Sequence, residues 1–456
     1  MEVSVFSYAG IVVGIFILVI TIAYPIFAIY LLPVAFSLSP EIVVGATAAR
    51  EITVRIEDFL IAVLLIRILF EFVLMGQFPP PKLRYNAVII LSMFLYSMSL
   101  VLSTSAGVAI LAVSPTGGFF FVLKLIQFFL FYFVFFYYIR SQRDINIVLA
   151  VSLITLSIMT IYGTLQIPLG ERISMPFEGS KAGEAEPNTF GGYLVLLGSI
   201  VAGLYSHETK RIKRVVYILL IASAIVPLVY TQSRTSWASA WVALMVFLII
   251  TKGLQRKVVI FSLMLLVVMS LPLMPGKIKQ RAEFWKSEEG FRSTETVGGT
   301  TFDPSTSERI GKYRQIPRYF SRNPVLGVGV TGAGFIDGQY VRVIIETGLL
   351  GVFTFSYFLY VILRYMYSVY KSTAIPFSKG FSLGLFCGTI GMLVHGLGAT
   401  TFFIVRIVEP YMMFLAILVS HGYITSVSKK AEMPIPSQYV YPYLIWHPAT
   451  ESRVDT

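Results

Sequence analysis

Apolar runs recur along most of the chain and are separated by short polar or charged segments. A helix needs about 20 such residues to cross the hydrocarbon core of a bilayer, and most of the runs reach that length. The pattern therefore predicts an all-α polytopic membrane protein with about twelve transmembrane helices. The predicted spans cover residues 5–37, 57–76, 86–104, 117–139, 144–163, 188–206, 213–231, 235–251, 256–274, 341–367, 378–397 and 402–422.

One predicted span and one loop differ from this regular pattern. The first run is longer than the others and contains Pro25 and Pro33, so it is either a long kinked helix or a short helical hairpin. The segment 275–340, between spans nine and ten, is a large polar loop. We treat residues 1–456 as one integral membrane domain that carries this loop and a C-terminal tail, 423–456.

Basic residues mark every second loop, whereas the alternate short loops 105–116 and 398–401 carry no charge. The basic loops carry Lys82, Arg84, Arg140, Arg143, Lys210, Arg211, Lys213, Arg214, Lys252, Arg256, Lys257, Lys371, Lys379, Lys429 and Lys430. Positive charge favours the cytoplasmic side. The pattern predicts a protein of the inner (cytoplasmic) membrane with both termini in the cytoplasm. The loops 38–56, 164–187, 231–234 and 275–340 then lie on the outer, periplasmic face.

Composition supports the membrane assignment and excludes other classes. Of 456 residues, 56% are hydrophobic and 13% are charged. The net charge of +12 belongs to loops and lipid contacts in such a protein, so we do not expect nucleic-acid binding. Cys387 is the one cysteine, which excludes an internal disulfide and a cysteine-based metal site.

Arg234 breaks the charge pattern, because it lies in the tight outer turn TQSRTSW. One interpretation is an arginine whose guanidinium reaches the membrane interface. The other is an anion ligand at the mouth of the helix bundle. The turn also supplies hydroxyl groups that can cap the adjoining helix ends, from Thr231, Ser233, Thr235 and Ser236.

A basic segment closes the large loop. From Ser307 the run SERIGKYRQIPRYFSRNP alternates basic and apolar residues at helical spacing, and its cations are Arg309, Lys312, Arg314, Arg318 and Arg322. This spacing predicts an amphipathic helix on the outer membrane surface that ends before Asn323-Pro324. Its basic face is either solvated or directed at a phosphorylated lipid.

Ionisable residues also occur inside the predicted spans, where charge is costly and often functional. They form the spaced pairs Arg67/Glu71, Arg342/Glu346 and Arg406/Glu409, with Lys124 and His395 as further members. Each pair can neutralise itself along one helix face. Alternatively, Arg342/Glu346, Arg406/Glu409 and His395 border one outer cavity with Arg234. Outer DxD, Walker, HExxH and nucleophile-elbow motifs are absent, so we expect chemistry by arginines and one carboxylate, with no metal and no cofactor.

Three ordered elements, TQSRTSW, SERIGKYRQIPRYFSRNPVLGVG and DGQYVRVIIETGLLG, resemble the O-antigen ligase/polymerase superfamily. The resemblance covers roughly residues 186–351 and begins at EPNTFGGYL, which contains Asn188. It implies a GT-C-like membrane glycosyltransferase that uses sugars on a polyprenyl-diphosphate carrier at the outer face.

The resemblance also implies site residues. Arg234 and Arg309 match the family's arginines. Asp337 stands where ligases of the superfamily carry a histidine, and nine residues separate the pair Asp337–Gly338 from Gly348. Aspartate at this position looks more like a Wzy-type polymerase. Arginine would stabilise the departing diphosphate, and Asp337 would act as base or orient the acceptor, with His395 or Glu346 as other candidate bases. The candidate substrate-binding residues are Asn188, Arg314, Arg318, Arg342, Glu346, His395, Arg406 and Glu409.

The preferred hypothesis is a polymerase that joins polyprenyl-diphosphate-linked oligosaccharide units into O-antigen or exopolysaccharide. The alternatives are an O-antigen ligase, a lipid-linked sugar transporter or flippase, and a non-catalytic assembly protein. A twelve-span transporter commonly has two related halves joined by a long central connection, whereas the corresponding segment here, 207–212, is short. The expected partners are the lipid-linked donor and acceptor and the bilayer, and a chain-length regulator is a further candidate.

Overall fold

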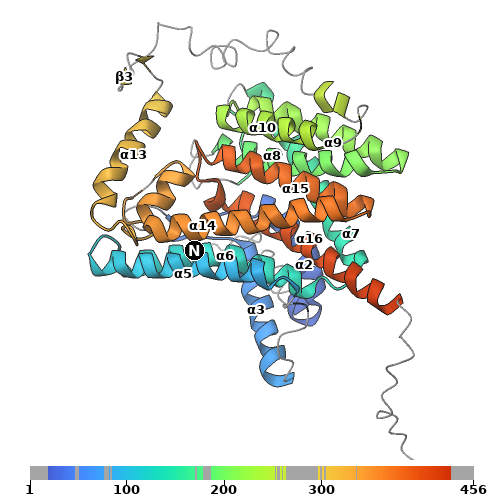
Figure 1. Cartoon of the computed structure of the whole chain (residues 1–456), viewed down its shortest axis with the longest axis horizontal. Helices are drawn as coiled ribbons and strands as arrows, with labels where there is room; N and C mark the ends of the chain where they lie inside the picture. The colour runs from blue at the N-terminus through green and yellow to red at the C-terminus, as the bar shows by residue number, and fades with distance from the viewer. Residues whose placement is uncertain are drawn as a thin grey trace, which may run out of the picture.

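The computed structural model describes residues 19–46, 51–75, 82, 85–169, 172–177, 186–251, 253, 257–258, 260–262, 296–297, 300–301, 304–334 and 336–432 (Figure 1). These residues form a bundle in which most helices lie along one common axis (Figure 1). The helical elements are α2 (Pro25–Leu38), α3 (Ile56–Met75), α5 (Ala87–Ala109), α6 (Pro115–Tyr138), α7 (Gln142–Leu165), η1 (Ile167–Leu169), α8 (Pro187–His207), α9 (Arg211–Tyr230), α10 (Arg234–Ile250), α13 (Pro304–Phe320), α14 (Gln339–Ser372), α15 (Pro376–His395), η4 (Thr401–Phe403) and α16 (Val405–Glu432). The strands form two antiparallel pairs, β1 (Ile42–Ala46) with β2 (Glu51–Val54) and β3 (Thr296–Val297) with β4 (Thr300–Thr301).

The described part contains 8 helices that are long and apolar enough to cross a membrane: α5, α6, α7 with η1, α8, α9, α14, α15 and α16. Each coincides with a predicted span, which confirms a multi-pass helical membrane protein. α2 and α10 are shorter apolar helices, and α3 is a 20-residue helix with several charged side chains. The predicted span 256–274 lies largely outside the described residues, so the number twelve stays a prediction. The β1–β2 hairpin lies in the loop 38–56, for which no strand was predicted.

Helix α8 forms the centre of the bundle. In its most apolar window 89% of the residues are buried, against 39% for the peripheral α9. Its closest neighbour is α15, whose Gly380 and Gly384 face Gly203 so tightly that a Cβ on Gly203 would lie 2.3 Å from the carbonyl oxygen of Gly380. Small residues permit this backbone contact, which is a common basis of helix association in membranes.

One end of the bundle brings together the starts of α8, α10 and α14 and the ends of α5 and α15. We call it the Arg234 end. Hydrogen bonds connect these segments directly, among them Ser233 to Asn188, Gln339 to Gly396 and Val330 to Thr104. Helix α13 runs crosswise to α14 at this end (Figure 1).

The opposite end of the bundle carries the basic loops. There the ammonium of Lys82 donates to the carbonyl oxygens of Phe136 and Ile139, which close the C-terminus of α6. The hydroxyl of Tyr370 donates to the carbonyl of Ile250 at 3.1 Å. The structure therefore separates the two sets of loops that the charge pattern distinguishes. Which set faces the cytoplasm stays a prediction.

Candidate functional site at the Arg234 end

A tight turn between α9 and α10 positions Arg234. Ser233 caps α10, because its Oγ accepts a hydrogen bond from the backbone nitrogen of Ser236 at 3.2 Å. The turn is sharp enough to place Gln232 at a φ of 52°. Arg234 is consequently the first residue of α10, and its side chain is half-buried. The positive end of the helix dipole lies at the same point, so this turn favours an anion.

A chain of side-chain hydrogen bonds leads inward from this turn. Ser233 Oγ donates to Asn188 Oδ1 at 2.7 Å, and Ser236 Oγ donates to Ser233 Oγ at 2.7 Å. Ser236 Oγ also lies 3.1 Å from Nε2 of His395, whose Nδ1 lies 2.7 Å from Oγ1 of Thr401. We call these five residues the His395 chain. It joins α8, α10, α15 and η4, and His395 itself has an exposed fraction of 0%.

Two adjacent glycines of α8 make room for the His395 chain. A Cβ on Gly191 would lie 2.1 Å from Ser236 Oγ, and a Cβ on Gly192 would lie 3.2 Å from His395 Cε1. Larger residues at these positions would displace the hydroxyl and the imidazole. The sequence EPNTFGGYL therefore supplies both a polar end of the chain, Asn188, and the space in which the chain forms.

The start of α14 places Asp337 beside the end of α15. The backbone nitrogen of Gln339 donates to the carbonyl oxygens of Gly396 at 2.9 Å and Ala399 at 3.2 Å. Asp337 precedes the N-cap Gly338, whose φ is 106°, and its side chain is half-buried. Asp337 is thus two residues from a backbone contact with the segment that directly follows His395.

Gln339 and Thr401 are polar site residues that the sequence did not single out. The Oε1 of Gln339 accepts from the backbone nitrogen of Phe402 at 2.9 Å. Its Nε2 is buried and has no hydrogen-bond partner within the described part of the chain. Both residues are uncharged and lie in predicted loops, 275–340 and 398–401, so only the folded contacts identify them.

Arg342 and Glu346 form the predicted pair, with 3.0 Å between Nε and Oε2. Both are buried, and the guanidinium lies over the ring of Phe403 at 4.2 Å from its centroid. The second carboxylate oxygen of Glu346 accepts from the backbone nitrogen of Thr331 at 3.0 Å. The pair therefore fixes the segment before α14 against the helix, with each partner already engaged.

The motifs NPVLGVG and TGLLG are two halves of one structural unit. Gly348 has a φ of 58° and breaks the regular geometry of α14. The backbone nitrogens of Val328 and Gly329 donate to the freed carbonyls of Ile345 and Glu346 at 3.0 and 2.9 Å. A Cβ on Gly348 would lie 2.6 Å from the nitrogen of Gly327, so glycine is required for this close approach.

Helix α13 confirms the predicted amphipathic helix. Ile316 and Tyr319 pack against a buried cluster that includes Val341 and Ile345 of α14, whereas Arg314 and Arg318 are exposed. The backbone of Arg309 lies in α13, and its side chain lies outside the described residues. The structure thus places the basic helix at the Arg234 end.

Arg406 and Glu409 have partners other than each other, so the self-pairing that was one of the two alternatives for them is not what their contacts show. Arg406 donates to the carbonyl oxygens of Ser37 at 2.5 Å, Ser39 at 3.1 Å and Phe177 at 2.9 Å. The cation near Glu409 is Lys124, at 3.8 Å. The i,i+3 spacing does not indicate these partners, because backbone carbonyls and a second helix supply them.

Lys124 and Glu409 belong to a separate ionic cluster next to the β1–β2 hairpin. Lys124 lies 2.5 Å from Asp58, and Arg55 contacts Glu41 and lies 3.7 Å from Glu57. Burial works against the charge of Arg55, but Glu41 and Glu57 outweigh it and raise the pKa of the guanidinium. No hydrogen bond joins this cluster to the His395 chain within the described residues. In that part of the chain no group of three or more His, Cys, Asp or Glu side chains is arranged to hold a metal ion.

Comparison with known proteins agrees with the resemblance seen in the motifs. The family model of O-antigen ligase matches residues 218–356. The match contains Arg234, α13, Asp337 and the Gly348 break, and it ends before His395. No curated protein matches the chain. This matched segment carries the similarity of the chain to the O-antigen ligase/polymerase superfamily.

Proposed function

We propose that this protein is a membrane glycosyltransferase that polymerises polyprenyl-diphosphate-linked oligosaccharide units, in the manner of a Wzy-type polymerase. The observation that carries the proposal is the convergence of Asn188, the Arg234 turn, His395 and the Asp337 segment at one end of the bundle. We propose that this end faces the periplasm, with about twelve spans and both termini in the cytoplasm.

In the proposed reaction the acceptor hydroxyl attacks the anomeric carbon of the donor sugar. A new glycosidic bond forms as the bond from the anomeric carbon to the diphosphate oxygen breaks, and polyprenyl diphosphate leaves with the electron pair. Arg234 and Arg309 stabilise the negative charge that develops on this leaving group. Asp337 orients the acceptor and receives its proton. Asp337 suits this role better than Glu346 or His395 because its side chain is half-buried, whereas theirs are buried.

The second candidate is an O-antigen ligase, which would use the same donor site and a different acceptor. The description of the matching family favours it. Asp337 at the position where ligases of the superfamily carry a histidine favours the polymerase. In both cases the diphosphate leaves in the same way, so the acceptor distinguishes the two.

The test is an assay with purified protein and a polyprenyl-diphosphate oligosaccharide, run with a chelator and compared with added Mg²⁺. A ladder of multiplied units, lost in Asp337→Asn, supports the polymerase. A single transfer to an added lipid acceptor, with no ladder, supports the ligase. If proteoliposomes instead move the donor across the bilayer and form no new glycosidic bond, the protein is a transporter and the proposal is wrong.

A further inference from the structure

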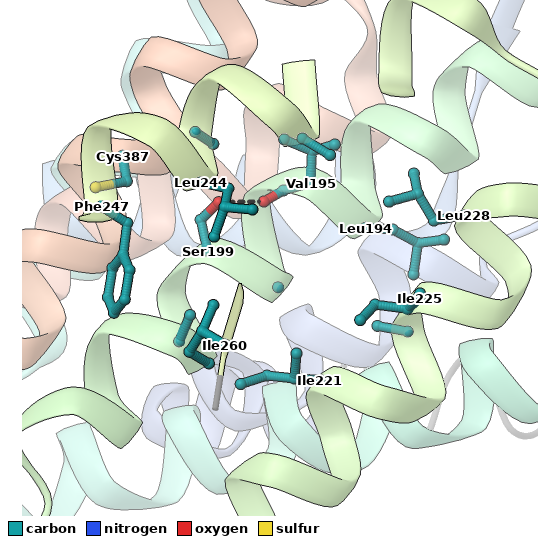
Figure 2. Close-up of a pocket in the computed structure, with 15 residues that line it drawn as sticks. Leu194, Val195, Ser199, Ile221, Ile225, Leu228, Leu244, Phe247, Ile260 and Cys387 are labelled. Carbon is teal, nitrogen blue, oxygen red and sulfur yellow. Dashed lines mark hydrogen bonds between the residues drawn. The ribbon is translucent and has the colours of Figure 1, made fainter. Parts of the chain in front are cut away.

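An apolar groove lies between α8, α9 and α10, with Cys387 of α15 at its floor (Figure 2). The space along it that protein atoms do not fill is about 620 Å³, and this volume includes space that is open to the surroundings. Ser199 is the hydroxyl-bearing residue in the lining, and its Oγ donates to the carbonyl of Val195 at 2.7 Å, as the dashed line in Figure 2 shows. The lining therefore offers a ligand dispersion contacts and apolar surface, and no hydroxyl in need of a partner.

Gly198 shows that the groove is open space. Among the described residues, a Cβ built on Gly198 meets nothing within 4 Å, whereas a Cβ on Gly191, Gly192 or Gly203 of the same helix meets atoms at 2.1 to 2.5 Å. Glycine inside a helix costs about 1 kcal/mol relative to alanine. At the other three positions close packing favours glycine, but at Gly198 no described neighbour does. The missing side chain leaves room that no described residue fills.

The groove starts directly below the Arg234 turn. Leu228, which lines it, uses its carbonyl oxygen to accept from Thr231 Oγ1 at 2.7 Å and from Trp237 Nε1 at 3.0 Å. From Leu228 the lining of α9 continues to Ile221, seven residues or roughly 10 Å along the helix axis. The groove thus joins the anion-favouring turn to the apolar interior of the bundle, along α8 and α9, which are long and apolar enough to span a membrane, and the shorter apolar helix α10.

We infer that this groove holds the isoprenoid chain of the donor, specifically the segment nearest the diphosphate. The inference rests on the proposed function. A diphosphate at Arg234 would send its lipid chain from the turn into the adjoining groove, and the remaining chain would continue into the bilayer because the groove is short. Burying the proximal units gives affinity from apolar area removed from water and fixes the direction in which the diphosphate leaves.

A photoaffinity experiment tests the inference without relying on turnover. The probe is a polyprenyl diphosphate that carries a diazirine on the isoprene unit nearest the diphosphate. We expect labelled peptides from α8, α9 and α10 around Leu194, Ile225 and Leu244. Excess polyprenyl diphosphate should remove the labelling, and the same excess of phosphatidylglycerol should leave it. Equal competition by the phospholipid would make the groove a site for bulk lipid and overturn the inference.

Variants of the groove test whether the labelling depends on it. Gly198→Phe fills the space and should lower labelling and donor affinity about tenfold, equivalent to about 1.4 kcal/mol of binding free energy. Leu219→Phe on α9 is the matched control, because Leu219 is 63% exposed and lies outside the lining.

Gly198→Ala should raise the melting temperature, which verifies that the space is open. If Gly198→Phe folds, forms polymer and keeps full labelling, the groove assignment is wrong while the proposed function stands. If wild type forms no glycosidic bond, the proposed function fails by itself.

Discussion

The Arg234 turn and the start of α16 lie at the same end of the bundle, yet they use an arginine in opposite ways. Arg406 has an exposed fraction of 1% and donates to three backbone carbonyls, two at the C-terminal end of α2 and one in the segment 172–177. Arg234 is half-buried at the first position of α10, beside a capped helix end. The protein encloses the first arginine almost completely, whereas the second is partly exposed at the start of a helix.

The comparison shows that position along a membrane helix does not identify a ligand-binding arginine. Both residues lie near the same end of their spans, and sequence spacing offered Arg406 a local partner, Glu409. The backbone carbonyls of Ser37, Ser39 and Phe177 hold Arg406, because buried carbonyl oxygens need donors and a guanidinium has five. We therefore expect Arg406 to affect stability and Arg234 to affect the reaction.

The largest effect is expected for Arg406→Ala. The substitution leaves three buried carbonyl oxygens without this donor. Because one unsatisfied buried acceptor costs about 1–3 kcal/mol, we expect a loss of several kcal/mol of unfolding free energy. Thermal unfolding in detergent measures it, with Arg314→Ala, an exposed arginine of α13, as the control. A melting temperature equal to that of wild type would show that the carbonyls find other donors, and would remove the contrast with Arg234.

Arg234→Ala is expected to lower the rate of glycosyl transfer about 10²–10³-fold, the range for loss of one group that stabilises developing negative charge. Its melting temperature should stay that of wild type. Arg234→Lys keeps the charge but loses the bidentate contact, so it should recover part of the rate. Normal polymer from Arg234→Ala would contradict the role in leaving-group stabilisation. A large loss of stability would show that Arg234, like Arg406, has a structural role.

Gly348→Ala tests whether the break in α14 holds the site segment. The backbone of Gly348, at φ 58° and ψ −158°, suits glycine almost exclusively, and a Cβ would approach Val325 and Gly327 at 2.6 Å. The expected loss is about 1–3 kcal/mol of unfolding free energy, measured by thermal unfolding. Gly198→Ala is the matched change in open space and should be neutral or stabilising. Equal stability of the two variants would show that the break adapts to a side chain.

The sequence predicted the eight spans that the described residues contain, the turn at Arg234 and the basic helix α13, because each depends on a local pattern. It could not predict contacts between distant segments. Thr401 binds His395 and Gln339 binds the segment 396–402 only after α10, α14 and α15 pack together. The Gly348 break likewise looks like ordinary helix in the sequence, because the loop that occupies it lies twenty residues earlier along the chain. The roles of Asp337 and Arg309 remain predictions from the resemblance.

Ser236→Ala should give the smallest effect and tests the His395 chain, which has no counterpart around Arg406. The substitution removes the hydroxyl between Ser233 and His395. We expect the free energy of unfolding to fall by about 1 kcal/mol and the rate of glycosyl transfer to fall several-fold. Ser239→Ala is the control on the same helix, because Ser239 is equally buried and donates only to the carbonyl of Thr235. If the chain positions the Arg234 turn, Ser236→Ala should lower the rate at saturating donor while Ser239→Ala does not. Identical rates for the two variants would show that the His395 chain serves only the packing of the helices. The position of Arg234 would then depend on the α10 cap alone.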